Sequence, residues 1–557
     1  MAFGPEIICG VAAALRARLP WHVGKVEGGD TWAAMKISYR DRWLVLSWGG
    51  GTAGCCLAGE RDVLALRDGA CARSPLVEAL RSRASRGEIV GARQLGRDRI
   101  IELELRRRVA AGTSVEHRLI LEATEPVASL MLTDASGKIV ELARHAAPDR
   151  NAYRTLLPGH PYVPPPPFRG ASPDDVSELR FEDVGELAGI GRPLARIVQA
   201  RWGDRDPHVW LAALREAATS DRPLPCWLIG KGYIGRLGVG LPDAVPLGDD
   251  ALAAAARGVL APMLERVRQR RLREVGAKID RALKARARHR DGLLKQMRDH
   301  EGADAFRQKG EAILANVASI PRGATEIALT DWEGRSVVVE LDPRLSPSKN
   351  AERWFKRYRK AKGDPRAIAE ALAAVEGAMR ELGEQRAFLE AIDDPGAFER
   401  AVADLEAWLD PKGKERAKGK GRSAKAKDAP PHLAIEMDGL TILVGLSARG
   451  NRYVTFRQAR PEDLWLHAHE LPGAHAIIRG ARDRAELEGP RRAVLERAAS
   501  LAAWHSKGKG SGHVQVDYTE RRHVRPVPGT VALVTYTEPG TLRVVPSAPT
   551  EDGRSAR

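Results

Sequence analysis

The sequence predicts a multidomain α/β protein with an N-terminal α/β domain, a helical hairpin domain, an antiparallel coiled-coil arm and a C-terminal α/β domain. Three observations carry this prediction. A chain of 557 residues is too long for one hydrophobic core. Segments with the period-two alternation of strands gather toward both ends, and apolar residues at helical spacing fill two long stretches between them. The expected parts are 1–170, 171–250, a coiled-coil middle domain 251–410, a basic linker 411–431 and a last domain 432–550.

The N-terminal part has the pattern of an antiparallel sheet. Ile101–Leu105 alternates with period two, and Leu119–Leu121 is a short apolar run, so both are expected to be strands. A hairpin should follow, in which Leu130–Thr133 and Ile139–Leu142 are joined by a short turn. The proline run Pro164–Pro167 then stiffens the exit from the domain.

Residues 171 to about 249 are expected to be helical with short turns. Gly189–Pro193, between apolar runs, resembles the hairpin of a helix-hairpin-helix motif, whose backbone amides can meet phosphate. An ordinary turn between two helices explains a single copy equally well.

The middle of the chain predicts a projecting arm. Apolar residues recur at helical spacing over Met263–Met297, and Ile368–Leu389 repeats in steps of four and three. Two such stretches predict an antiparallel coiled coil, on the order of 50 Å long at the α-helical rise. Between them, Ile327–Thr330 and Val337–Leu341 should form a hairpin. The last domain should be short strands with one helix around Ala493–His505.

Charge and cysteine content limit the partners. The net charge is +16, and a surface this basic commonly binds polyanions, nucleic acid first and anionic membranes second. Pro411–Lys427 holds eight Lys or Arg against one Glu, a composition that cannot support a core, so we expect a disordered basic linker. Five cysteines without a paired C-x-x-C spacing fit a reducing compartment, and no apolar run is long enough to span a membrane. We therefore expect a cytoplasmic protein without a membrane partner.

The segment 461–479, PEDLWLHAHELPGAHAIIR, is the most informative in the chain. It places a tryptophan, three histidines and a Pro-Gly turn in one strand-turn-strand pattern. A hydrophobic core does not need so many polar aromatic side chains, so this segment is expected to bind something. The pattern resembles the RNA-binding domain of the NFACT family. The matching residues that the resemblance makes nucleic-acid-binding candidates are Asp463, Trp465, His467, Pro472, Gly473 and His475, whereas Ala474 and Ala476 replace the usual Ser and Val.

The resemblance extends along most of the chain. Gly310–Asn316 and Ser346–Ala351 look like signatures of the family's middle region. Asp98 and Arg99 match a pair that the family needs for transfer RNA binding, and the fork of Arg99 suits a phosphate or a base edge. A local ion pair at a strand start is the alternative. The sequence departs from the family's pattern at Gly445–Ser447, where Gly-Arg-Asn is usual.

The three histidines leave two chemistries open. His467, His469 and His475 could hold zinc with an open position, but no carboxylate lies at ligand spacing, so we expect no metal. Stacking of unpaired bases on Trp465, His467 and His475 is better supported, at about 1 to 3 kcal/mol for each base. A buried, structural Trp465 is the alternative to stacking.

The resemblance implies a ribosome quality-control factor. Such a protein would bind a large ribosomal subunit that still carries a stalled nascent chain on peptidyl-tRNA, deliver alanyl-tRNA and direct template-free addition of alanine. No catalytic arrangement stands out, so we expect a non-enzyme without cofactors that supplies positioning. A ribosome-binding homologue without tailing activity, a surface fibronectin-binding adhesin and a metalloenzyme built on the three histidines are the other classes considered.

Overall fold

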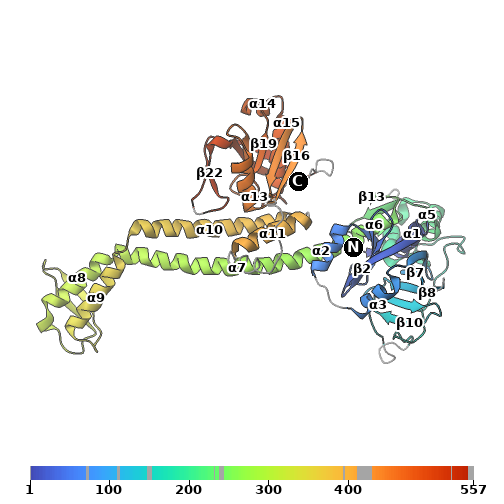
Figure 1. Cartoon of the computed structure of the whole chain (residues 1–557), viewed down its shortest axis with the longest axis horizontal. Coiled ribbons are helices and arrows are strands. Elements are labelled where there is room, and N and C mark those ends of the chain that lie inside the picture. The colour runs from blue at the N-terminus through green and yellow to red at the C-terminus, as the bar shows by residue number, and fades with distance from the viewer. Residues whose placement is uncertain are drawn as a thin grey trace. The chain divides into compact units, whose positions relative to one another are not determined.

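The computed structural model describes residues 2–69, 74–109, 113–146, 153–230, 232–237, 244–392, 395–409, 429–528 and 530–549. The chain forms two compact units, Met1–Arg271 and Leu272–Arg557 (Figure 1). The expected basic linker lies outside the described residues up to position 428. The prediction of a mixed α/β chain with a long helix is confirmed, and the bounds of the five expected parts stay a prediction.

The first unit is built on an antiparallel sheet in which nine strands are described. Their order is β10-β9-β8-β7-β6-β2-β3-β4-β5. The bounds are β2 Trp21–Gly29, β3 Trp32–Ile37, β4 Trp43–Ser47, β5 Gly54–Ala58, β6 Glu88–Gln94, β7 Ile100–Arg108, β8 Ser114–Glu122, β9 Ser129–Asp134 and β10 Ile139–Leu142. The strands and the hairpin predicted from residues 101–142 are confirmed.

Helices of the first unit complete the core of this sheet. They are α1 Pro5–Arg16, α2 Glu60–Gly69, α3 Pro75–Ala84 and α6 Ala251–Gly258. Proline at the first position suits the start of α1, because its missing N–H would have no helical partner. Ile7, Ile8 and Leu15 of α1 are fully buried in the same cluster as Trp21 and Trp43. Buried Glu122 on β8 accepts hydrogen bonds from Arg154 and from Tyr162, so the chain after β10 is attached to this sheet.

Residues 171–249 are less helical than predicted. Helices α4, Arg192–Ala200, and α5, Pro207–Thr219, are present, but β11 Cys226–Ile229, β12 Tyr233–Gly235 and β13 Ala244–Gly248 follow. They join β1, Ala2–Phe3, in a sheet of order β1-β12-β11-β13. The helical expectation is therefore wrong for residues 226–248, where β12 pairs with β11 and also with β1, a long-range partner that no local pattern reveals.

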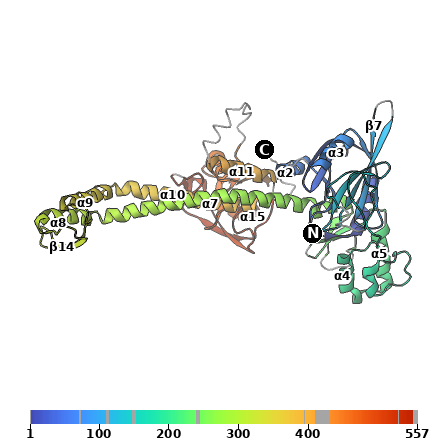
Figure 2. The ribbon, with the colours of Figure 1, turned by 90° about the horizontal axis from the view of Figure 1, so that it is seen from below.

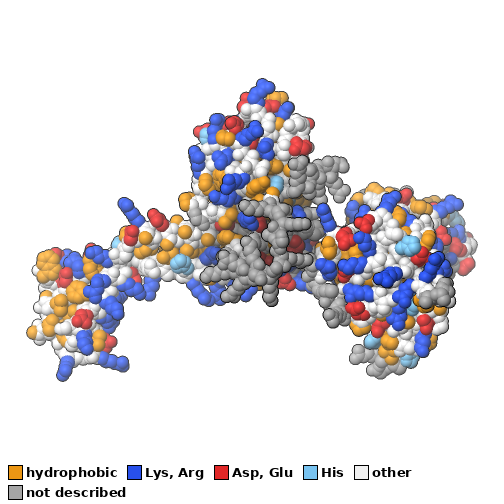
Figure 3. Space-filling view, viewed as in Figure 1, with side chains coloured by type: hydrophobic (Ala, Val, Ile, Leu, Met, Phe, Trp, Pro, Cys, Tyr) orange, Lys and Arg blue, Asp and Glu red, His pale blue; other side chains and the backbone are white. Residues whose placement is uncertain are grey.

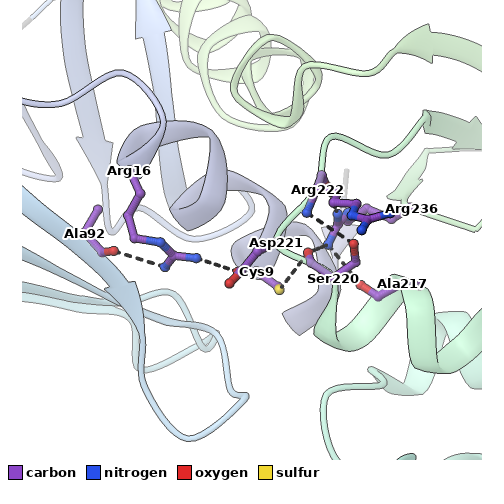
Figure 4. Close-up of polar contacts among 8 residues, drawn as sticks. All are labelled: Cys9, Arg16, Ala92, Ala217, Ser220, Asp221, Arg222 and Arg236. Carbon is purple, nitrogen blue, oxygen red and sulfur yellow. Dashed lines mark hydrogen bonds and ion pairs between the residues drawn. The ribbon is translucent and has the colours of Figure 1, made fainter.

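Arg236 closes the C-terminal end of α5. Its guanidinium donates to the carbonyl oxygens of Ala217 and Ser220, both at 3.1 Å, and of Arg222 at 2.9 Å (Figure 4). A cation at this end satisfies carbonyl groups that have no partner within the helix. The thiol of Cys9 on α1 lies against the same Ser220 carbonyl.

The segment after α5 is also fixed to the large sheet through α1. Arg16 pairs with Asp221 at 2.5 Å and donates to the carbonyl of Ala92 on β6 at 3.2 Å (Figure 4). Residues far apart in the sequence therefore converge around α1.

The second unit contains the predicted helical arm. Helix α7, Leu260–Glu301, is 42 residues long and extends from the first unit into the second. Within the second unit it runs beside α10, Pro365–Ala391, in the opposite direction (Figure 2). Asp280 pairs with Arg386 at 3.0 Å across the two helices, and Lys278 pairs with Glu406 of α11, Pro395–Leu409, at 2.6 Å. The two long helices predicted for the arm are confirmed.

A small module connects α7 to α10. It consists of α8 Ala303–Ala315, β14 Glu326–Thr330, β15 Ser336–Glu340 and α9 Pro347–Ala361, so the predicted hairpin is confirmed. Its own core gathers around buried Trp354, with Ile313, Leu329 and Val339. The guanidinium of Arg357 lies 4.5 Å from the Trp354 ring centroid.

The C-terminal sheet packs on α15 and on the arm helices of the same unit. Among the described residues its order is β16-β17-β19-β18-β20-β23. The bounds are β16 His432–Met437, β17 Leu440–Gly445, β18 Leu464–Ala468, β19 Ala476–Arg479, β20 Val514–Glu520, β23 Gly540–Val544 and α15 Arg492–Trp504. One hydrophobic cluster joins Leu382 and Phe388 of α10, Phe398 of α11 and Leu466 of β18. The arm helices therefore complete the core of this sheet.

Candidate nucleic-acid interface

The segment 461–479 forms the strand-turn-strand unit that its sequence predicts. Strands β18 and β19 pair antiparallel, with Trp465 opposite Ile477. In the connection, Gly473 forms an isolated bridge with Ser506, and a Cβ on Gly473 would come within 2.7 Å of the Ser506 Cβ. The close approach of two backbones explains why glycine occupies this position.

Trp465 is fully buried, with no exposed side-chain area. Its ring packs parallel to the imidazole of His467, with centroids 5.7 Å apart, and edge-on to His475 at 5.2 Å. Tyr536 covers it at 4.9 Å. The ring of Trp465 therefore has no open face on which a base could stack. The indole packs against the two histidines instead.

The two histidines are held uncharged. Burial lowers the pKa of His467 to about 4, although Asp517 and the Gly473 carbonyl act in the opposite direction. Burial also lowers the pKa of His475 well below its usual range, and His467 adds to this effect. The His475 Nδ1 lies 2.9 Å from the Thr455 hydroxyl. A neutral imidazole has one donor and one acceptor, so this pair is suited to hydrogen bonding and not to binding an anion by charge.

Asn451 holds the Pro-Gly turn in place, a role that the sequence did not reveal. Its Nδ2 donates to the Gly473 carbonyl at 3.1 Å, and its Oδ1 accepts from the His475 amide at 3.0 Å. The side chain is buried. Its sequence signal is weak, because Asn451 lies 22 residues before the turn that it fixes.

Asp463 serves the turn that leads into β18. Its Oδ2 accepts from the Arg460 amide at 2.7 Å, and its carbonyl accepts from the Arg521 amide at 2.8 Å. The side chain is buried, so Asp463 is surrounded by the chain itself and not by solvent. Pro472 is half-buried and lies on the wall of a pocket.

His469 is the third histidine of the zinc site that the sequence left open as an alternative. It follows the end of β18, and its Nδ1 lies 2.7 Å from Asp517 Oδ2, which raises the pKa of this imidazole. Within the described ranges, no group of three or more His, Cys, Asp or Glu side chains is placed to hold a metal ion. The geometry therefore gives the metalloenzyme alternative no support.

A pocket of about 640 Å³ opens beside the histidines. His467, Pro472 and His475 of the motif line one part of it. The opposite wall is helix α10, through residues that the sequence presented only as part of a helical repeat: Arg380, Gly383, Glu384, Arg386, Ala387 and Glu390. Spatial proximity alone connects these residues with the motif.

Asp98 and Arg99 lie in the turn before β7 of the first unit, both half-buried. Asp98 Oδ1 accepts from the Arg99 amide at 2.6 Å, which fixes the turn. The side chain of Arg99 forms no hydrogen bond or ion pair with any residue in the described part of the chain. The alternative, a local ion pair between the two side chains, is therefore not formed, and transfer RNA binding by the pair stays a prediction.

A buried acid lies close enough to Arg99 to sense its charge. Glu6 is fully buried and accepts a hydrogen bond from the Tyr233 hydroxyl. Burial raises the pKa of Glu6 to about 7, whereas Tyr233, Arg236 and Arg99 act in the opposite direction. No sequence pattern pointed to this group, because β12 brings Tyr233 to α1 from more than 200 positions away.

Basic side chains also mark the module that connects α7 and α10. Figure 3 shows Lys and Arg side chains gathered over α8 and α9. On α9 they are Lys349, Arg353, Lys356, Arg357, Arg359 and Lys360.

Within the described residues, no helix combines the length and apolar character that crossing a bilayer requires.

Comparison with known proteins identifies the class. The family model for NFACT N-terminal and middle domains matches residues 35–200 and 262–422, more than half of the chain. The chain belongs to the NFACT family, as the sequence motifs predicted. Two similar curated proteins are named Rqc2 homolog RqcH: one from Streptococcus suis, 30% identical with 82% of each chain covered, and one from Bacillus subtilis, 29% identical with 85% of each covered. Among solved structures, the C-terminal part of the fibronectin/fibrinogen-binding protein of Streptococcus suis matches with a TM-score of 0.34 and 25% identity, covering 51% of this chain and 96% of that one.

Proposed function

We propose that this chain is a ribosome quality-control factor. It binds a large ribosomal subunit that carries a stalled nascent chain on peptidyl-tRNA, brings alanyl-tRNA to it and directs template-free alanine tailing. The observation that carries the proposal is the similarity to proteins named Rqc2 homolog RqcH over 82–85% of both chains. The net charge of +16 is in keeping with a partner made of RNA. Such a role requires a cytoplasmic protein.

In this proposal the chain positions its partners and the ribosome supplies the chemistry. Holding two reactants in a productive geometry can by itself contribute a large part of a rate enhancement. The departure at Gly445–Ser447 bears on whether tailing occurs. Ser447 donates to Asp404 at 3.1 Å and accepts from the Gly450 amide at 2.9 Å, so its hydroxyl is committed within the chain.

The module between α7 and α10 allows a direct test of subunit binding. Because α10 and α11 share a core with the C-terminal sheet, deleting the whole arm would also unfold that sheet. Replacing 302–362 with a short Gly-Ser turn removes only α8, β14, β15 and α9, which have their own core. Co-sedimentation with purified large subunits should be lost, and thermal melting of the remainder should be preserved.

Undiminished sedimentation of this variant would exclude the module as the ribosome anchor. Alanine tails on the nascent chain, measured by mass spectrometry, separate the remaining alternatives. Binding without tails would support a homologue that lacks tailing activity. Binding to immobilised fibronectin with no affinity for subunits would instead support the adhesin.

A further inference from the structure

The pocket beside the C-terminal motif has the size and construction of a ligand site. Its volume of about 640 Å³ lies within the usual range for small-molecule sites, roughly 300 to 1,000 Å³. The C-terminal residues that line it come from the end of β18 and the turn after it, from Lys507, and from Ala532, Leu533, Val534 and Tyr536. Gly383 and Glu384 contribute from α10.

The two walls of the pocket are fastened to each other. The carboxylate of Glu381, buried on α10, accepts from the amides of Val531 and Ala532 at 2.9 and 3.1 Å. Lys509 donates to the carbonyl of Ala391 at the end of α10, at 3.2 Å. The pocket is thus formed before any ligand arrives, which reduces the cost of ordering it on binding.

The interior of the pocket is uncharged and partly aromatic. His467 and His475 are neutral at pH 7 for the reasons given above. The Tyr536 hydroxyl donates to Asp517 at 2.6 Å, which fixes the ring. Apolar side chains of Leu471, Leu533 and Val534 complete this part of the lining.

These groups suit a flat aromatic ligand better than an anion. Burial raises the pKa of Glu384 to about 7, although Arg380 acts in the opposite direction, so this carboxyl beside the histidines gains negative charge near neutral pH. A phosphate placed among neutral imidazoles and a titrating carboxyl would lack compensating charge. A ring with its own donors and acceptors would instead match the neutral histidines.

Cationic side chains are placed at the outer lining. Arg380 and Lys507 are exposed, and neither side chain has a hydrogen-bond or ion-pair partner among the described residues. Arg386 is exposed as well but pairs with Asp280 and Glu390. Two uncommitted cations beside an uncharged pocket fit a ligand whose ring carries phosphate on its outer side.

We propose that this pocket binds one unpaired nucleobase of a single-stranded RNA, with the adjoining phosphates beside Arg380 and Lys507. The choice of RNA over a free nucleotide rests on the proposed function. Of the motif's side chains, half-buried His467 is placed to contact the base, whereas buried His475 and Trp465 support it.

Substitution of Gly383 by a larger residue can fill the pocket without disturbing the fold. A Cβ on Gly383 would meet no atom within 4 Å, and the same holds for Gly276 on α7, which does not line the pocket. The variants Gly383→Leu and Gly276→Leu therefore form a matched pair, since leucine favours a helix more than glycine does. Binding of a short single-stranded oligoribonucleotide containing one 2-aminopurine is measured by fluorescence, beside the same oligonucleotide with an abasic site at that position.

Gly383→Leu should weaken binding of the base-containing RNA roughly tenfold relative to Gly276→Leu, in line with the loss of one base contact. The abasic RNA should bind both variants equally and more weakly than the intact RNA. If intact and abasic RNA bind wild-type protein equally well, the pocket proposal is overturned while RNA binding by the chain stands. Absence of binding by the oligoribonucleotide also overturns the pocket proposal, whereas co-sedimentation with large subunits tests the proposed function separately. Displacement of the RNA by a free nucleotide but not by an abasic strand supports the base pocket.

Discussion

The indole of Trp465 lies edge-on to the imidazole of His475, with ring centroids 5.2 Å apart and planes at 82°. Both side chains are buried, so the tryptophan acts on this histidine from inside the fold. Aromatic pairs in this arrangement add about 0.5 to 1.5 kcal/mol beyond the area that they bury. The motif that suggested an RNA-stacking surface is therefore organised around a packed aromatic cluster, with only part of His467 reaching the surface.

The first prediction concerns Trp465 itself. Trp465→Ala should destabilise the protein by about 3 to 5 kcal/mol, because it leaves a cavity in a closed core. Trp465→Phe should cost less, since it keeps most of the aromatic contact. Thermal melting followed by near-UV circular dichroism measures both. Normal melting of the alanine variant, combined with weaker RNA binding, would show instead that the indole stacks on RNA.

The second prediction concerns Arg99. Arg99→Ala, alone or with Asp98→Ala, should weaken transfer RNA binding, because this guanidinium has no partner in the described structure. If it meets a phosphate, the slope of log affinity against log salt should flatten by about one. Arg106→Ala is the charge-matched control, since Arg106 is exposed and paired with Glu116 at 3.2 Å. If both variants lose the same transfer RNA affinity, the loss comes from the change in net charge and not from a specific contact of Arg99.

The third prediction is a pH dependence that originates in Glu6. The pKa of this carboxyl is about 7 in the folded chain and 4.5 ordinarily, so the folded state keeps a proton that the unfolded state has lost. Stability from this group is therefore greatest below pH 4.5 and declines as the pH rises to about 7. Glu6→Gln should match wild type near pH 4.5 and be more stable at pH 8, by on the order of 3 kcal/mol.

Melting temperatures of wild type and Glu6→Gln across this pH range measure the difference. Glu182→Gln, at an exposed carboxylate in the same unit, is the control and should show no such trend. Parallel profiles of wild type and Glu6→Gln would mean that the buried carboxyl ionises normally.

The fourth prediction concerns the contact between α10 and the C-terminal sheet. Glu381→Ala leaves the buried amides of Val531 and Ala532 without an acceptor, and each such loss costs about 1 to 3 kcal/mol. The melting temperature should fall, and Glu370→Ala, at an exposed position of the same helix, should leave it unchanged. An unchanged melting temperature for Glu381→Ala would mean that water takes the place of the carboxylate as acceptor of the two amides.

Local periodicity revealed much of the fold but little of the site. The spacing of Ile368–Leu389 predicted α10, and the alternation at Ile101–Leu105 predicted β7, because each element buries one face that recurs along the chain. Strands β11 to β13 were missed, since they are short and one of them, β12, is completed by a partner at the start of the chain. Similarly, the motif predicted β18, the turn and β19, but burial of Trp465 depends on Tyr536, which lies 71 positions later.

The shared core of α10, α11 and the C-terminal sheet has a consequence for how this protein tolerates cutting. A protease nick between 410 and 428 would sever the backbone but remove none of the contacts that join Leu382, Phe398 and Leu466. The two fragments should therefore stay associated as a noncovalent complex, and two separately produced halves divided there should reconstitute one another. The C-terminal sheet begun at His432 without its helices would instead present an uncovered apolar face and aggregate.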